Sequence, residues 1–149
     1  MTDVGFYHLT ASPLETALPR LLEKVLASGL RAVVMAGSPE RVEALNSQLW
    51  TFNPGSFLPH GSAADGNAAD QPIWLTDTDE NPNGASVLVL TEGVRSERIG
   101  DFARCLDLFD GADAEAVAAA RARWAEYKSR GFTVTYFQQT TGGGWEKKA

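Results

Sequence analysis

The sequence predicts a single α/β domain with a mostly parallel sheet and helices on both faces of that sheet. Short apolar segments that read as strands alternate along the chain with segments whose apolar residues recur every three or four positions. The apolar segments are continuous, which is typical of parallel strands that are covered on both sides. A chain of 149 residues has the length of one domain, so residues 1–149 are expected to form one unit.

The first part of the chain is expected to contain two strand–helix units. Residues 4–9 form the first predicted strand, and Ser12 is placed to cap the helix that follows, which Gly29 ends. Residues 31–36 are apolar throughout and form the second predicted strand. The next helix begins with another serine–proline pair and ends near Trp50.

The middle of the chain is expected to be more irregular. Residues 51–72 are rich in turn-forming residues and read as a long loop. Three strands are predicted after this loop, and a short helix over residues 96–102 precedes the last of them. These strands are residues 73–76, 86–91 and 104–109.

The last part of the chain adds one helix and one strand. Asp113 is expected to cap a helix that runs to about Ser129, and a β-branched and aromatic strand follows at residues 132–137. Residues 138–149 contain three consecutive glycines and are expected to form a flexible C-terminal tail. In total five or six strands are expected, with the first two near the centre of the sheet.

The charge of the chain is acidic overall but unevenly distributed. The formal net charge is −6, which argues against direct binding of nucleic acid over a broad face. Residues 1–120 carry 7 Lys and Arg against 17 Asp and Glu, whereas residues 121–149 carry 6 against 2. This basic segment either suits a small anionic partner or is simply a solvated face. No signal peptide or membrane span is evident, so a cytoplasmic protein with no membrane partner is expected.

The sequence predicts no catalytic residue, no metal site and no cofactor. The turn after the first strand lacks the glycines of phosphate-binding loops. Cys105 is the only cysteine and is expected to be a buried thiol, while His8 and His60 are too few for a zinc site and are expected to be structural. Asp107 and Asp110 are spaced to point to different faces, so a turn role is favoured over a magnesium pair.

Aromatic and basic residues form the candidate binding set. Trp50 and Phe57 lie at and after a predicted helix end, and Arg121, Arg123 and Trp124 lie on the last predicted helix. Arg121 and Trp124 are three positions apart and therefore share a helix face. Aromatic rings beside guanidinium groups are typical of interface hot spots and suit an acidic peptide that carries an aromatic side chain and ends in a carboxylate. The pattern alone also fits two tryptophans that belong to the core.

Three stretches in different parts of the chain form a set. They are VGFYHL (4–9), LW (49–50) with PGSFLPH (54–60), and RWAEYKSRGF (123–132) with YFQQ (136–139). Together and in this order they resemble the chi-subunit family of bacterial DNA polymerase III. One departure is Ala125, where some relatives carry a basic residue, and this would weaken electrostatic steering of an anionic partner.

The resemblance implies a Rossmann-like α/β domain that acts as a non-catalytic adaptor in the clamp-loader assembly. Members of this family bind the acidic C-terminal tail of single-stranded-DNA-binding protein and pair with a psi subunit. By resemblance, Trp50, Arg121 and Trp124 form the tail pocket. Phe57 and Arg123 match neighbouring positions.

Two alternatives belong to other functional classes. One is a small nucleotide-binding α/β enzyme that uses the strand ends near His8 and Gly37, and nucleotide bound to the purified protein would favour it. The other is a module that binds single-stranded DNA directly through its basic segment and aromatic stacking. That module would show affinity for bare oligonucleotides that falls steeply with salt.

Overall fold

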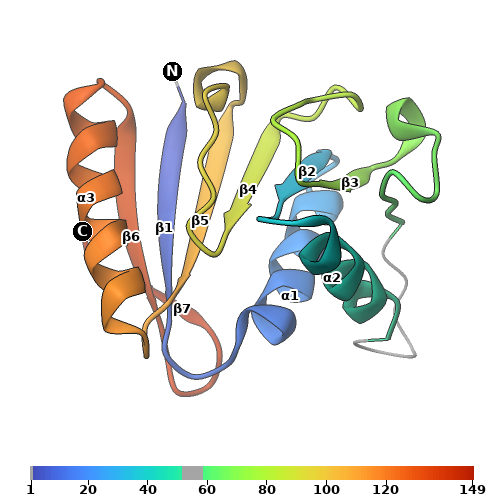
Figure 1. The fold of residues 1–149 in the computed structure, drawn as a ribbon. Helices are drawn as coiled ribbons and strands as arrows, with labels where there is room; N and C mark the ends of the chain where they lie inside the picture. Colours follow the sequence, from blue (N-terminus) through green and yellow to red (C-terminus); the bar gives the residue numbers. More distant parts are fainter. Residues whose placement is uncertain (1, 52–58) are drawn as a thin grey trace.

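The computed structural model describes residues 2–51 and 59–149 and has the predicted α/β architecture (Figure 1). Two short 3-10 helices, Ala68–Asp70 and Ile99–Asp101, accompany the main elements. In chain order the main elements are β1 (Asp3–Leu9), α1 (Leu14–Ala27), β2 (Ala32–Met35), α2 (Pro39–Thr51), β3 (Ile73–Thr76), β4 (Val87–Thr91), β5 (Arg104–Asp110), α3 (Ala114–Ser129), β6 (Thr133–Gln139) and β7 (Trp145–Lys147).

The described strands form one sheet in the order β3-β2-β4-β5-β1-β6-β7. Every neighbouring pair is parallel except β6 and β7, which are antiparallel. The α1 and α2 helices pack on one face of the sheet and α3 packs on the other (Figure 1). The predicted fold class is therefore confirmed.

The two faces of the sheet have separate apolar cores. Along β1, Val4 and Phe6 belong to the core beneath α3, whereas Tyr7 and Leu9 belong to the core beneath α1 and α2. This follows from the alternation of side chains along a strand. Every residue of β2, β3 and β4 is buried, which explains why these strands read as continuous apolar runs.

The strand order corrects one expectation about the centre of the sheet. β1 is an interior strand, as predicted, but β2 lies second from the β3 edge. The middle strand of the seven described strands is β5 and its neighbours are β4 and β1, so the expected central position is confirmed for β1 and wrong for β2. Strand order depends on long-range packing, so the early position of β2 in the chain was a poor guide to its place in the sheet.

The expected flexible tail over residues 138–149 instead contains regular structure. Gln138 and Gln139 complete β6, and β7 pairs with it after a turn in which Thr140 N donates to Gly144 O at 2.8 Å. Gly143 adopts φ 88°, a left-handed conformation that glycine takes without strain. The ring of Trp145 packs edge-on against Tyr7, with centroids 5.0 Å apart. The glycine run therefore forms a tight turn, and Trp145 anchors the strand beyond it.

The helix starts show one correct and one wrong cap prediction. Asp113 caps α3, because its Oδ1 accepts hydrogen bonds from Glu115 N at 2.9 Å and Ala116 N at 3.4 Å. Ser12 does not cap α1, which begins at Leu14 with Pro13 in the capping position. None of the helices in the described ranges is long and apolar enough to cross a membrane.

Candidate peptide-binding site

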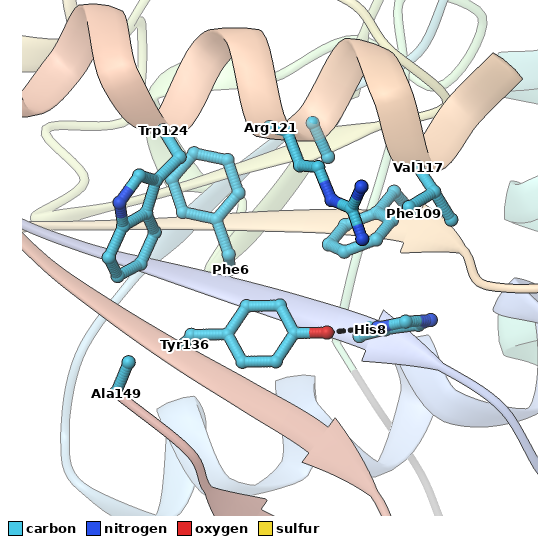
Figure 2. Close-up of a pocket in the computed structure, with 9 residues that line it drawn as sticks. Phe6, His8, Phe109, Val117, Arg121, Trp124, Tyr136 and Ala149 are labelled. Atoms are coloured by element: carbon cyan, nitrogen blue, oxygen red, sulfur yellow. Dashed lines mark hydrogen bonds between the residues drawn. The ribbon is translucent and has the colours of Figure 1, made fainter. Parts of the chain in front are cut away.

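A pocket of about 330 Å³ lies between α3 and the strands beneath it (Figure 2). Most of its wall is aromatic, and its single arginine comes from α3. Residues opposite each other in the sheet face the same side, and the register pairs Phe6 with Tyr136 and His8 with Phe109. The main wall residues are Phe6, His8, Phe109, Arg121, Trp124 and Tyr136.

Trp124 forms one wall of this pocket. Its indole ring is edge-on to Phe6 at 5.6 Å and to Tyr136 at 6.3 Å between ring centroids. The side chain is half-buried, so one part of the ring packs on the core while another faces the pocket. Such edge-on aromatic arrangements readily accept a further ring, because ring edges and faces attract each other.

Arg121 brings positive charge to the same pocket. It is exposed, and its guanidinium extends from α3 toward His8 and the Tyr136 hydroxyl (Figure 2). Burial lowers the pKa of His8 and raises that of Tyr136; the charge of Arg121 adds to the first shift and opposes the second. Lys148 also acts on Tyr136 by charge, although burial is the stronger influence and raises the pKa of that tyrosine. The pocket therefore combines aromatic walls with a positive potential, which suits an anion attached to an apolar group.

His8 also belongs to this pocket, although the sequence suggested only a structural role. Its Nδ1 shares a hydrogen bond with the Tyr136 hydroxyl, and its ring lies 4.9 Å from that of Phe109 between centroids. Burial is the largest influence on the imidazole and lowers its pKa, so the ring is neutral at neutral pH. Because Phe6 and His8 are two apart on one strand, their shared face was a usable sequence signal.

Arg123 was expected to contact the acidic tail of the partner. Its side chain is instead buried on the inward side of α3. Its Nε donates to Asp107 Oδ2 at 2.7 Å and its Nη2 donates to Asp107 Oδ1 at 2.9 Å. Burial raises the pKa of Asp107 and the arginine opposes that rise. Asp107 and Asp110 do point apart, as the spacing predicted, and Asp110 accepts a turn hydrogen bond from Ala112 N at 2.9 Å. The ion pair itself was not anticipated.

Trp50 lies outside this pocket. It is at the end of α2, which packs on the face of the sheet opposite α3. The indole is 52% exposed, and its ring lies 4.5 Å from that of His60 between centroids. The three residues expected to form one site, Trp50, Arg121 and Trp124, therefore do not lie at one pocket. Phe57 lies outside the described residues.

The turn between β1 and α1 is where an α/β sheet would bind a nucleotide, but here a glutamine side chain occupies it. Gln139 Oε1 accepts hydrogen bonds from the backbone N–H groups of Thr10, Ala11 and Ser12 at 3.2, 2.9 and 3.0 Å. A phosphate would need these same donors. The geometry argues against the nucleotide-binding alternative.

Neither metal binding nor catalysis by a cysteine nucleophile finds support in the described part of the chain. Residues 2–51 and 59–149 hold no group of three His, Cys, Asp or Glu side chains that could bind a metal ion. Cys105 is 1% exposed, which confirms the buried thiol that was predicted. Burial raises its pKa well above the usual value, and a thiol held in this form is a poor nucleophile.

Comparisons with known proteins identify the family of this chain. The family described as "DNA polymerase III chi subunit, HolC" matches residues 1–135, which include β1 and all of α3. A protein of Rickettsia prowazekii (strain Madrid E), described as a probable DNA polymerase III subunit chi, is 40% identical over 90 residues. The aligned stretch is 60% of this chain and 54% of the relative, so it spans about half the length of that relative. Because the family match covers most of the chain, this protein belongs to the chi-subunit family of DNA polymerase III.

Proposed function

We propose that this chain is a cytoplasmic, non-catalytic adaptor of DNA polymerase III that binds the acidic C-terminal tail of single-stranded-DNA-binding protein in the α3 pocket. The observation that carries the proposal is Arg121, whose guanidinium extends over an aromatic-walled pocket. Family membership supplies the replication context. Neither a cofactor nor a bond-making step is part of this role.

The size of the pocket favours a peptide end over a folded partner. Its volume of about 330 Å³ is at the small end of the range for ligand pockets, so it admits one or two side chains. An aromatic residue at the end of the tail would pack between Trp124 and Phe6, and burying such a side chain contributes about 1.5–3 kcal/mol. Its terminal carboxylate would lie near Arg121.

Charge supports the same orientation of the peptide. A hydrogen bond between a guanidinium and a carboxylate contributes about 1.5–3 kcal/mol, and the acidic residues preceding the tail's end would meet the basic segment 121–149. Ordering a flexible tail offsets much of this gain, so affinity in the micromolar range is expected. Because part of the attraction is between exposed charges, binding should weaken as salt is added.

A second partner surface is proposed around Trp50. A large indole that is 52% exposed is unusual for a lone domain and typical of an interface anchor. This surface lies on the opposite face of the sheet from the tail pocket, so two partners could bind at once. The proposed occupant is a psi subunit or another clamp-loader component, which would make the chain a tether between the polymerase machinery and coated single strands.

The experiment is a calorimetric titration with an acidic peptide that ends in an aromatic residue with a free carboxylate. Wild type should bind it with micromolar affinity, and Arg121→Ala and Trp124→Ala should each weaken binding by about tenfold or more, which is about 1.4 kcal/mol. Trp50→Ala is the matched control and should bind as wild type does. A version of the peptide with an amidated end should bind more weakly.

Two results would contradict the proposal. One is wild-type protein, folded by circular dichroism, that does not bind the peptide. The other is a Trp50→Ala variant that loses binding while Arg121→Ala binds as wild type does. That result would place the peptide site on the α2 surface.

A further inference from the structure

His8 is held in the pocket wall by contacts on both edges of its ring. On one edge, Nδ1 shares a hydrogen bond with the hydroxyl of Tyr136. On the other edge, Nε2 lies so close to Gly111 that an added Cβ there would collide with the ring. Burial lowers the pKa of His8, and a hydrogen bond with the backbone of Gly111 partly opposes that shift. A bond with that effect has the ring as donor and the carbonyl as acceptor.

These contacts favour one tautomer of the neutral ring. We assign the hydrogen of the neutral ring to Nε2, because this nitrogen faces Gly111 and Nδ1 faces Tyr136; Nδ1 then has a lone pair and accepts the hydroxyl hydrogen of Tyr136. In this state the Tyr136 hydroxyl has no hydrogen to offer to a ligand in the pocket.

Protonation of the ring reverses the bond to Tyr136. With hydrogens on both nitrogens, His8 donates from Nδ1 to the tyrosine oxygen, and the hydroxyl hydrogen must turn away from the ring. Tyr136 lines the pocket beside Arg121, so the released hydrogen becomes a donor for an anion there. The imidazolium at the same time adds a second positive charge to the pocket.

We propose that His8 and Tyr136 form a proton-dependent part of the tail site, in which protonation of His8 strengthens binding of a peptide carboxylate. This inference rests on the proposed function and adds to it a residue pair and a direction of pH dependence. It predicts that the adaptor holds its partner more tightly at mildly acidic pH.

The charged and titratable groups around His8 set the sign of the effect. Arg121 faces it from α3 and Tyr136 from β6, while β5 contributes the uncharged ring of Phe109, and Lys148 acts on Tyr136. In the free protein, burial and the charge of Arg121 lower the pKa of His8, against the bond to Gly111. A bound carboxylate opposes the charge of Arg121 and so raises that pKa.

By linkage, peptide binding then takes up a proton, and affinity rises as the pH falls. A rise of one unit in the pKa of His8 on binding corresponds to about tenfold tighter binding at the acidic limit.

The test measures peptide affinity between about pH 8 and about pH 5.5, a range in which histidine titrates and the acidic side chains of the peptide stay charged. Wild type should bind several-fold more tightly at the acidic end. His8→Gln, which keeps a hydrogen-bonding side chain but cannot gain the charge, should show a flat profile. Tyr136→Phe should show a reduced slope, and His60→Gln is the control that should match wild type.

Proton nuclear magnetic resonance of His8 in the wild-type protein gives an answer that does not depend on a variant. Its pKa should rise when the peptide is added. An unchanged pKa, or the same affinity slope in His8→Gln as in wild type, would overturn this inference and leave the proposed function standing. Absence of wild-type binding at every pH would instead overturn both.

Discussion

Arg123 and Asp107 are joined by two hydrogen bonds, of 2.7 and 2.9 Å, in the interior between α3 and β5. The exposed fractions of these residues are 4% and 1%. The pair ties the helix to the strand, and Arg121 and Trp124 flank it in sequence on the same helix. Arg123 therefore helps to hold α3 in place, and this helix carries Arg121 and Trp124, which line the pocket of Figure 2.

Removing either charge of this pair should be strongly destabilising. Arg123→Met leaves the Asp107 carboxylate buried without a partner, and Asp107→Leu does the same to the guanidinium. Each change should lower the free energy of unfolding by roughly 3–5 kcal/mol. The double variant removes both charges and should recover most of that loss. Urea denaturation followed by circular dichroism measures all three, and a double variant no more stable than the singles would contradict the prediction.

The buried hydroxyl of Tyr127 leads us to expect that the protein loses stability at alkaline pH. Its hydroxyl is buried and has no hydrogen-bond partner among the described residues. Burial, with smaller effects from Asp107 and Cys105, raises the pKa of Tyr127 to about 12. In the unfolded chain the tyrosine hydroxyl loses its proton at about pH 10, whereas the folded protein keeps that proton up to about pH 12. The free energy of unfolding should therefore fall as the pH rises from about 10 to about 12.

The matched variant for this group is Tyr127→Phe. It should lose this part of the alkaline decline and, because it removes an unsatisfied buried hydroxyl, gain roughly 1 kcal/mol at neutral pH. Tyr136→Phe, which alters a hydroxyl at the pocket, should keep the decline due to Tyr127. Urea denaturation at neutral and alkaline pH distinguishes them, and an equal decline in Tyr127→Phe and wild type would count against the assignment.

Local sequence patterns predicted most of the helices and strands. They carry no information about contacts between segments that are distant in the sequence. Continuous apolar runs identified β2, β3 and β4, and Asp113 was correctly placed as a cap. A signal for the buried arginine was present but unused. Arg123 is three residues after Ala120 and four before Tyr127, both buried, so it lies on the inward face of α3.

The candidate site was predicted only in part for a similar reason. Arg121 and Trp124 share a helix face that local spacing reveals, and the structure places both at one pocket. Trp50 was grouped with them by resemblance, but nothing in local spacing shows which face of the sheet a helix covers. His8 was expected to be structural, and its relation to Tyr136 appears only when β1 and β6 pair.

The hydrogen bonds of Gln139 predict that the stability of the β1–α1 turn depends on this one side chain. Its Oε1 accepts from three backbone N–H groups, and its Nε2 donates to Ser12 Oγ at 2.6 Å. Gln139→Ala removes the acceptor and should lower the free energy of unfolding by about 1–3 kcal/mol. Gln139→Glu keeps an oxygen in place and should be closer to wild type at neutral pH. Thermal denaturation of the two variants tests this, and equal losses would show that the acceptor is unimportant.

The proposal that two partners bind to opposite faces of the sheet predicts that the binding of each can be abolished separately. Trp50→Ala should abolish copurification with a coexpressed psi subunit or clamp-loader component, because truncating a central indole anchor typically costs 2 kcal/mol or more. It should leave affinity for the acidic peptide unchanged. Arg121→Ala should do the reverse, since it lies on the opposite face of the sheet. Size-exclusion chromatography of the coexpressed proteins, with peptide titration on the same samples, measures both properties. If both variants lost the same partner, the two surfaces would serve one interface, and the proposed tether would be wrong.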